Sequence, residues 1–183
     1  CGVTMSPLAF GVGFLVSIAL LLWAIVASKN DDSSAVIPGL MFAFVEGMLI
    51  APTIAMYTDK LGPATVQAMA FLTLGMTAVF GLIGSVFNFG YRKLESVCLV
   101  GLFGMILYGI YTVFAGIPSQ AIDNTYCAIG LVIFAGLFLV DFARLREAHK
   151  YGQNGWGLAM VIAINIYLDQ VNVFLLLLRS KSK

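Results

Sequence analysis

The sequence predicts an all-α integral membrane protein, a polytopic bundle of hydrophobic helices. Of its 183 residues, 61% are hydrophobic and only 10% are charged, and the mean hydropathy is +0.99. Apolar runs repeatedly reach the ~20 residues that a helix needs to cross a bilayer. Soluble domains are about 25% charged, and one water-soluble core could not bury this much apolar surface. The composition therefore excludes a soluble globular enzyme.

Six apolar segments predict six membrane helices. Each is about 34 Å long at 1.5 Å per residue, which is enough to span the hydrocarbon. Their runs lack the two-residue alternation of barrel strands, so helices are expected. The connections are short, which predicts a single transmembrane domain over 1–183. The segments cover residues 7–28, 34–58, 63–87, 94–116, 121–143 and 156–178.

Prolines and small residues predict the shape and packing of these helices. Pro38 and Pro63 fall in first turns, where a missing N–H costs little, whereas Pro52 falls inside the second segment and should kink it. Small residues in the third and fourth segments suit close helix packing in lipid. A generally high glycine content of membrane helices explains the same pattern equally well. These residues are Gly75, Gly81, Gly84, Ser85, Gly101, Gly104 and Gly109.

Charge and motifs narrow the function. Ten Lys and Arg against nine Asp and Glu leave a net charge of +1, which offers no basic surface for nucleic acid, so the expected partner is the lipid bilayer. The three cysteines are too few and too scattered for a disulfide framework or a metal cluster, and the lone His149 has no ligand partner at a useful spacing. The sequence contains no HExxH or GxSxG motif. We therefore expect neither an enzyme nor a bound cofactor.

The basic residues leave the topology of the last segment open. Lys and Arg concentrate in short cytoplasmic loops. If all six segments span, the bias is six basic residues to four, and a re-entrant last segment makes it nine to one. Charge favours the re-entrant form, whereas the 23-residue length favours a full span. The six are Lys29, Arg92, Lys93, Arg144, Arg146 and Lys150, and the four are Lys60, Arg179, Lys181 and Lys183.

Three acidic residues lie inside the predicted segments. An ionisable side chain at bilayer depth costs about 2.5–3.5 kcal/mol on insertion scales, so it is a functional candidate. Glu46 is at the centre of the second segment, Asp141 is near the end of the fifth, and Asp169 is near the middle of the sixth. A simpler alternative for Asp141 is an i,i+3 ion pair with Arg144. The remaining acids, in loops or at segment ends, are expected to be solvated: Asp59, Glu95, Asp123 and Glu147.

Asp169 lies on a polar face of its helix. Asn165, Asp169 and Asn172 are spaced i, i+4 and i+7, which places all three on one face. Such a face lines a water-filled path or pairs with neighbouring helices. The two asparagines could also serve only as hydrogen-bonding contacts between helices.

Three stretches of the sequence resemble the Bax inhibitor-1 family of multi-pass membrane proteins. They are residues 42–47 followed by Pro52, residues 134–141, and residues 166–179, which read IYLDQVNVFLLLLR. The last stretch resembles the family's LYLDFINLF signature nearly position for position. Family members have seven helices with the last one central, so the resemblance implies a further helix before Cys1.

The resemblance also implies a pH-sensitive calcium leak. Aspartates at the positions of Asp141 and Asp169 would form a hydrogen-bonded pair near the cytoplasmic side. Two carboxylates ~4 Å apart at an effective dielectric constant near 20 repel by about 4 kcal/mol, so they would share a proton. The protonation state would then decide whether the central helix is held or free. Calcium prefers oxygen ligands, which Asp141, Asp169 and Glu46 supply.

Depth in the membrane raises a difficulty for this aspartate pair. Straight spans place Asp141 about 13 Å from the midplane and Asp169 about 3 Å beyond it. A contact requires that the fifth helix continues to His149, that the last helix begins its membrane passage later than Trp156, or that it is re-entrant. A contact between Glu46 and Asp169 is the alternative. Some bacterial relatives are thought to use a basic residue in gating, and the predicted spans contain none.

A second class of function stays open, that of a non-conducting regulatory or adaptor subunit. It would bind another membrane complex, such as the membrane-bound AAA protease with which some bacterial family members are associated. A leak needs its acids, whereas an adaptor should tolerate Asp169→Asn and depend on its lipid-facing surface. Either function fits a bacterial plasma membrane, a mitochondrial inner membrane or an endoplasmic reticulum membrane.

Overall fold

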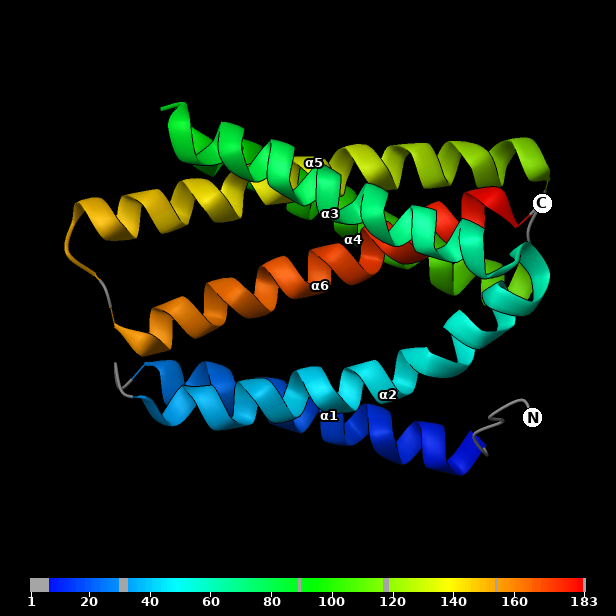
Figure 1. The fold of residues 1–183 in the computed structure, drawn as a ribbon, viewed down its shortest axis with the longest axis horizontal. Helices are drawn as coiled ribbons and strands as arrows, with labels where there is room; N and C mark the ends of the chain where they lie inside the picture. Colours follow the sequence, from blue (N-terminus) through cyan, green and yellow to red (C-terminus); the bar gives the residue numbers. More distant parts are fainter. Residues whose placement is uncertain (1–6, 30–32, 89, 117–118, 154, 183) are drawn as a thin grey trace. The chain divides into compact units, whose positions relative to one another are not determined.

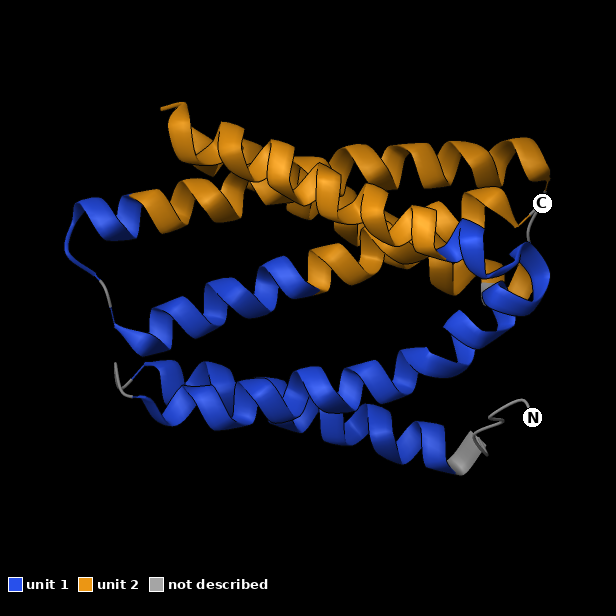
Figure 2. Ribbon diagram, viewed as in Figure 1, with its two compact units in different colours: residues 1–66, 147–167 blue, residues 67–146, 168–183 orange. Residues whose placement is uncertain are grey.

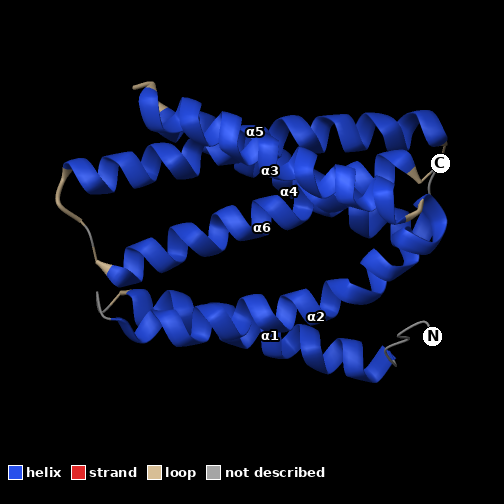
Figure 3. Cartoon of the chain, in the orientation of Figure 1, coloured by secondary structure: helices blue, strands red, loops and turns tan. Residues whose placement is uncertain are grey.

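A computed structural model describes residues 7–29, 33–88, 90–116, 119–153 and 155–182. All regular structure in these ranges is helical, as Figures 1 and 3 show. Cys1, the loop residues Asn30 to Asp32 and parts of three other predicted loops lie outside the described residues. The elements are α1 (Pro7–Ser28), a 3-10 turn η1 (Ser33–Ala35), α2 (Val36–Leu61), α3 (Pro63–Val86), α4 (Tyr91–Ala115), α5 (Gln120–Lys150) and α6 (Trp156–Lys181).

Each of the six predicted segments corresponds to one helix, and the largest difference is at the end of α5. The helix was expected to end at Ala143, but it continues to Lys150. The prediction followed the apolar run, whereas Arg, Leu, Glu and Ala are good helix formers that need no hydrocarbon around them. Gly152, at φ 68°, follows the helix in the left-handed conformation that commonly terminates one.

All six helices are long and apolar enough to cross a membrane. Many of their large apolar side chains are exposed on the protein surface, and Phe114 is 85% exposed. Such surface is favourable against lipid tails rather than against water. The chain is therefore an integral, multi-pass membrane protein.

Helix α2 is bent, as Pro52 predicts, and helix α6 is continuous. Pro52 lies inside α2, which bends along its second half (Figure 1), because proline removes one backbone hydrogen bond and its ring crowds the preceding turn. Helix α6 is unbroken over 26 residues, or about 39 Å. A re-entrant segment would need a break in this helix, so the structure favours a full span.

The chain forms two compact units, which Figure 2 distinguishes by colour. Unit 1 comprises residues 1–66 and 147–167, and unit 2 comprises residues 67–146 and 168–183. Helix α6 contributes its first half to unit 1 and its second half to unit 2. It packs against neighbouring helices within each unit, and the expected central position of the last helix stays a prediction.

In unit 1, α6 makes close contacts with α1 and α2. A Cβ atom at Gly157 would lie 2.4 Å from the Ser28 carbonyl oxygen, so only glycine permits this approach. The Tyr167 hydroxyl donates a hydrogen bond of 3.3 Å to the Ala43 carbonyl oxygen, and its ring meets Phe42 edge-on at 6.4 Å between centroids. These contacts fix the first half of α6 against both helices.

In unit 2, glycines allow α3 and α5 to approach each other. A Cβ atom at Gly84 would lie 2.6 Å from the Leu139 carbonyl oxygen, and one at Gly81 would lie 2.8 Å from the Phe142 ring. By contrast, a Cβ atom at Gly75 would have no contact within 4 Å. Both explanations of the small residues therefore apply: some sit at close contacts, and others reflect the general glycine content of membrane helices.

Replacement of Gly84 by alanine should destabilise the protein by about 1–3 kcal/mol, because the new methyl group would collide with backbone that cannot rotate away. Gly75→Ala, on the same helix, is the matched control and should be neutral or slightly stabilising. Thermal denaturation of both variants in detergent tests this. Equal melting temperatures for the two variants would contradict the described α3–α5 packing.

Candidate functional site

Asp169 is buried in unit 2, on the second half of α6. Only 7% of its surface is exposed, and its Oδ2 atom has no hydrogen-bond partner among the described residues. Its neighbour on the predicted polar face, Asn172, donates a hydrogen bond of 2.9 Å to the Leu168 carbonyl oxygen of the same helix. Because this bond lies within α6, it does not show Asn172 acting as a hydrogen-bonding contact between helices.

Asp141, on α5, is the acidic neighbour of Asp169. It is 4% exposed, and its carboxylate lies within electrostatic range of Asp169. Helix α5 continues through His149, which is one of the arrangements that would allow Asp141 to approach Asp169. Both acids are thus buried in unit 2 and close enough for their charges to interact. The free Oδ2 atom of Asp169 takes no part in a hydrogen bond, so the described arrangement is an electrostatic neighbourhood rather than a bond through that oxygen.

Arg144 stands beside this pair, but its principal partner is Glu95. The guanidinium forms a hydrogen-bonded ion pair with Glu95 on α4, and it is 3.9 Å from the Asp141 Oδ1 atom. The expectation that Glu95 is solvated is wrong, because its side chain is 22% exposed and paired. Arg144 lies one turn beyond Asp141, in the part of α5 that follows the predicted apolar segment, so the expectation that the spans hold no basic residue stays a prediction.

Two further polar contacts of this region were not predicted. Gln170, next to Asp169 in sequence, donates a hydrogen bond of 3.4 Å to the Thr77 hydroxyl on α3. The buried Cys98 on α4 lies within electrostatic range of Asp169. Neither contact has a signal in the sequence, because each joins residues more than 70 positions apart.

Arg146 is bound to the end of α3. Its guanidinium donates hydrogen bonds to the carbonyl oxygens of Gly84, at 3.3 Å, and of Phe87, and also to the Asn88 side chain. Carbonyl groups at a helix C-terminus lack partners within the helix and carry partial negative charge. Arg146, which was predicted to lie in a loop, therefore holds α5 against the C-terminal end of α3.

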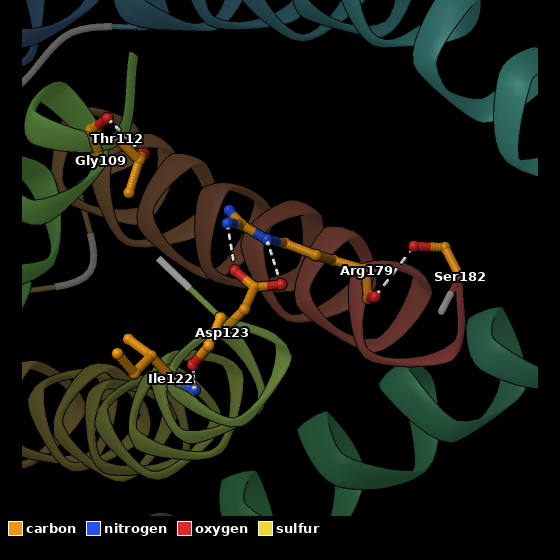
Figure 4. Close-up of polar contacts among 7 residues, drawn as sticks. Gly109, Thr112, Ile122, Asp123, Arg179 and Ser182 are labelled. Carbon is orange, nitrogen blue, oxygen red and sulfur yellow. Dashed lines mark hydrogen bonds and ion pairs between the residues drawn. The ribbon is translucent and has the colours of Figure 1, made fainter. Parts of the chain in front are cut away.

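Asp123 and Arg179 form a second ion pair in unit 2, which Figure 4 shows. Asp123, in the first turn of α5, is 0% exposed, and Arg179, in the last turn of α6, binds both of its oxygens. The Arg179 guanidinium also lies 5.0 Å from the centre of the Tyr126 ring, a cation–π geometry. The expectation that Asp123 is solvated is wrong, because the sequence did not reveal that the two helix ends meet.

Glu46 lies in unit 1 and is half-buried on α2. The Ser17 hydroxyl of α1 donates a hydrogen bond of 2.8 Å to its carboxylate, and Tyr167 lies within electrostatic range. Asn165, also in unit 1, is half-buried on α6. Asp169 belongs to the other unit, so the alternative contact between Glu46 and Asp169 stays a prediction.

The acids supply few ligands for a tightly held metal ion. Within the described ranges, no group of three or more His, Cys, Asp or Glu side chains is arranged to hold one. Calcium usually takes 6–8 oxygen ligands. The assignment of Asp141, Asp169 and Glu46 as calcium ligands therefore stays a prediction.

Asp123→Asn should lower the free energy of unfolding by about 3 kcal/mol, because it leaves Arg179 without its counter-charge. Asp59→Asn, which changes an exposed acid near the end of α2, is the control and should have little effect. The double variant Asp123→Leu, Arg179→Met should recover much of the loss. Chemical or thermal unfolding measures all three. If Asp123→Asn leaves the free energy of unfolding unchanged, the ion pair contributes nothing to stability.

Comparison with known proteins identifies the family. The family model described as "Inhibitor of apoptosis-promoting Bax1" matches residues 1–180. An uncharacterized protein of Borreliella burgdorferi is 26% identical over 183 residues, covering 96% of this chain and 72% of that protein.

Other bacterial relatives agree with this match. An uncharacterized membrane protein of Streptococcus pyogenes serotype M3 is 25% identical over 179 residues, which is 95% of this chain and 74% of that protein. The uncharacterized protein YrjE of Lactococcus lactis is 33% identical over 160 residues, which is 84% of this chain and 64% of that protein. With the model match over nearly all of its length, the chain belongs to the family of inhibitors of apoptosis-promoting Bax1, the Bax inhibitor-1 family.

Proposed function

We propose that this protein is a proton-gated cation leak, in which Asp141 and Asp169 share a proton and calcium is the permeant ion. One observation carries the proposal: two acids from different helices of unit 2 are buried within electrostatic range of each other, and one Asp169 oxygen has no hydrogen-bond partner among the described residues. An unpaired buried carboxylate is costly, so such an arrangement is unusual unless it has a function.

The gate works through charge repulsion. When both acids are ionised, two like charges face each other where water is scarce, and the helices that carry them are pushed apart. A single proton between the carboxylates removes the repulsion and supplies a hydrogen-bond donor. Because the two groups interact, they titrate as a pair rather than as independent acids.

Arg144 makes the two acids unequal. Its guanidinium lies 3.9 Å from Asp141 and is held in place by Glu95, so Asp141 can carry its charge beside a cation. Within the described residues Asp169 forms no ion pair. The shared proton is therefore expected to reside mainly on Asp169, at the unpartnered Oδ2 atom.

Polar groups on α6 would line the ion's route. Asn165, Asp169 and Asn172 share one face of the helix. Their oxygen atoms suit a hard cation such as calcium. Glu46, on α2 of unit 1, is the other acid proposed to meet the ion.

The proposal is tested by calcium flux into proteoliposomes at pH 6, 7 and 8. The wild-type flux should change with pH, and Asp141→Asn and Asp169→Asn should each abolish that change, because a neutral amide removes one half of the coupled pair. Asp59→Asn, at an exposed position, should retain the wild-type pH profile. Thermal unfolding confirms beforehand that each variant is folded.

Glu46→Gln separates conduction from gating. The amide can still accept the hydrogen bond from Ser17, so the local structure should persist. We expect a lower flux with an unchanged pH profile. If the wild type conducts no more than empty liposomes at any pH, the leak is excluded and a non-conducting adaptor that binds another membrane complex becomes the preferred function.

A further inference from the structure

Three basic side chains of unit 2 have no role in the proposed gate. Arg92 and Lys93 are in the first turn of α4, and Arg146 is on α5. We call them the basic cluster. Arg92 and Lys93 do not stabilise α4 itself, because the N-terminal end of a helix carries partial positive charge and disfavours cations.

Contacts between helices bring the basic cluster to one end of unit 2. Arg144 of α5 binds Glu95 of α4, and Arg92 is three residues before Glu95, which places both on one face of α4. Arg146, two residues after Arg144, binds carbonyl groups at the end of α3. The start of α4, the end of α3 and this part of α5 therefore lie at the same end of the unit.

The side chains of the cluster keep their positive charge. Arg92 and Lys93 are exposed and form no ion pair within the described residues. The partners of Arg146 are two backbone carbonyl groups and the Asn88 amide, all of which are uncharged. The cluster thus presents three positive charges.

Nearby acids do not neutralise these charges. Residues 84–96 contain one acid, Glu95, which is bound by Arg144. Asp141, also near Arg144, is 4% exposed and does not face the surface. Residues 147–150, which continue α5, contain one glutamate and one lysine and add no net charge.

The lengths of the spans place the cluster at the level of lipid headgroups. The span of α4 begins at Tyr91 and covers 22 residues, about 33 Å, which is close to the ~30 Å thickness of the hydrocarbon. Its first turn must therefore lie at the boundary between the hydrocarbon and the headgroups. The span of α3 ends at Val86, next to the carbonyl groups that Arg146 binds.

We propose that the basic cluster binds the phosphate group of an anionic phospholipid, such as phosphatidylglycerol. Guanidinium groups can donate two parallel hydrogen bonds to a phosphate, and each Lys or Arg near an anionic membrane surface strengthens attraction about fivefold. Phosphatidylcholine brings a cation of its own, so three unbalanced positive charges favour the anionic lipid over it.

The test titrates the full chain, purified in detergent, with phosphatidylglycerol or phosphatidylcholine of identical acyl chains. Native mass spectrometry measures the bound lipid. Wild type should bind phosphatidylglycerol more tightly, and high salt should weaken this preference, because salt screens exposed charges. Binding in micelles does not depend on the direction of membrane insertion, which basic residues also influence.

The double variant Arg92→Gln, Lys93→Gln should weaken phosphatidylglycerol binding about 25-fold and leave phosphatidylcholine binding unchanged. Lys60→Gln, Lys181→Gln is the matched control, because it removes two exposed positive charges outside the cluster. It should keep the wild-type preference, as should Lys93→Arg. If the first double variant melts at a lower temperature, its two single variants take its place, each with an expected loss of about fivefold.

Three outcomes would overturn the proposal. They are equal binding of the two lipids by the wild type, equal losses in the two double variants, and displacement of phosphatidylglycerol by inorganic phosphate at the same concentration. The last result would show that the cluster binds a free anion rather than a lipid. Calcium flux is not measured, so failure of the leak proposal would leave this result intact.

Discussion

Every peptide group inside the hydrocarbon must find a hydrogen-bond partner within the protein, and the rest of this structure depends on that constraint. It makes each spanning segment a helix and leaves only side chains to hold the helices together. Because lipid tails are as apolar as leucine, burial of apolar surface contributes little to that association. The helices are therefore held together by close packing against one another, and glycines such as Gly84 and Gly157 permit contact between the backbones of two helices.

The same scarcity of water explains why several charged side chains of unit 2 are paired. Asp123 binds Arg179, Glu95 binds Arg144, and Arg146 binds the carbonyl groups at the end of α3. These contacts join α3, α4 and α6 to α5. Asp169 differs from these residues, because its buried Oδ2 atom has no hydrogen-bond partner among the described residues. A site that departs from a rule which its neighbours obey is the natural place to look for function.

Helix α6 connects the two compact units of the chain. Its first half contacts α1 and α2, and its second half carries Asp169, Gln170 and Arg179, each of which has neighbours on other helices of unit 2. A change of charge at Asp169 would therefore act on a helix that belongs to both units.

The sequence alone determined the class of protein, the six helices, their approximate ends and the family, because hydropathy and local motifs are properties of neighbouring residues. It also singled out Asp141 and Asp169, since an acid in an apolar run is visible without a structure. Only the tertiary structure decided which acids have partners: Asp123 and Glu95 were expected in water, but they are paired with Arg179 and Arg144. Such pairs join residues about 50 positions apart, and their formation depends on helix packing, which no local pattern encodes.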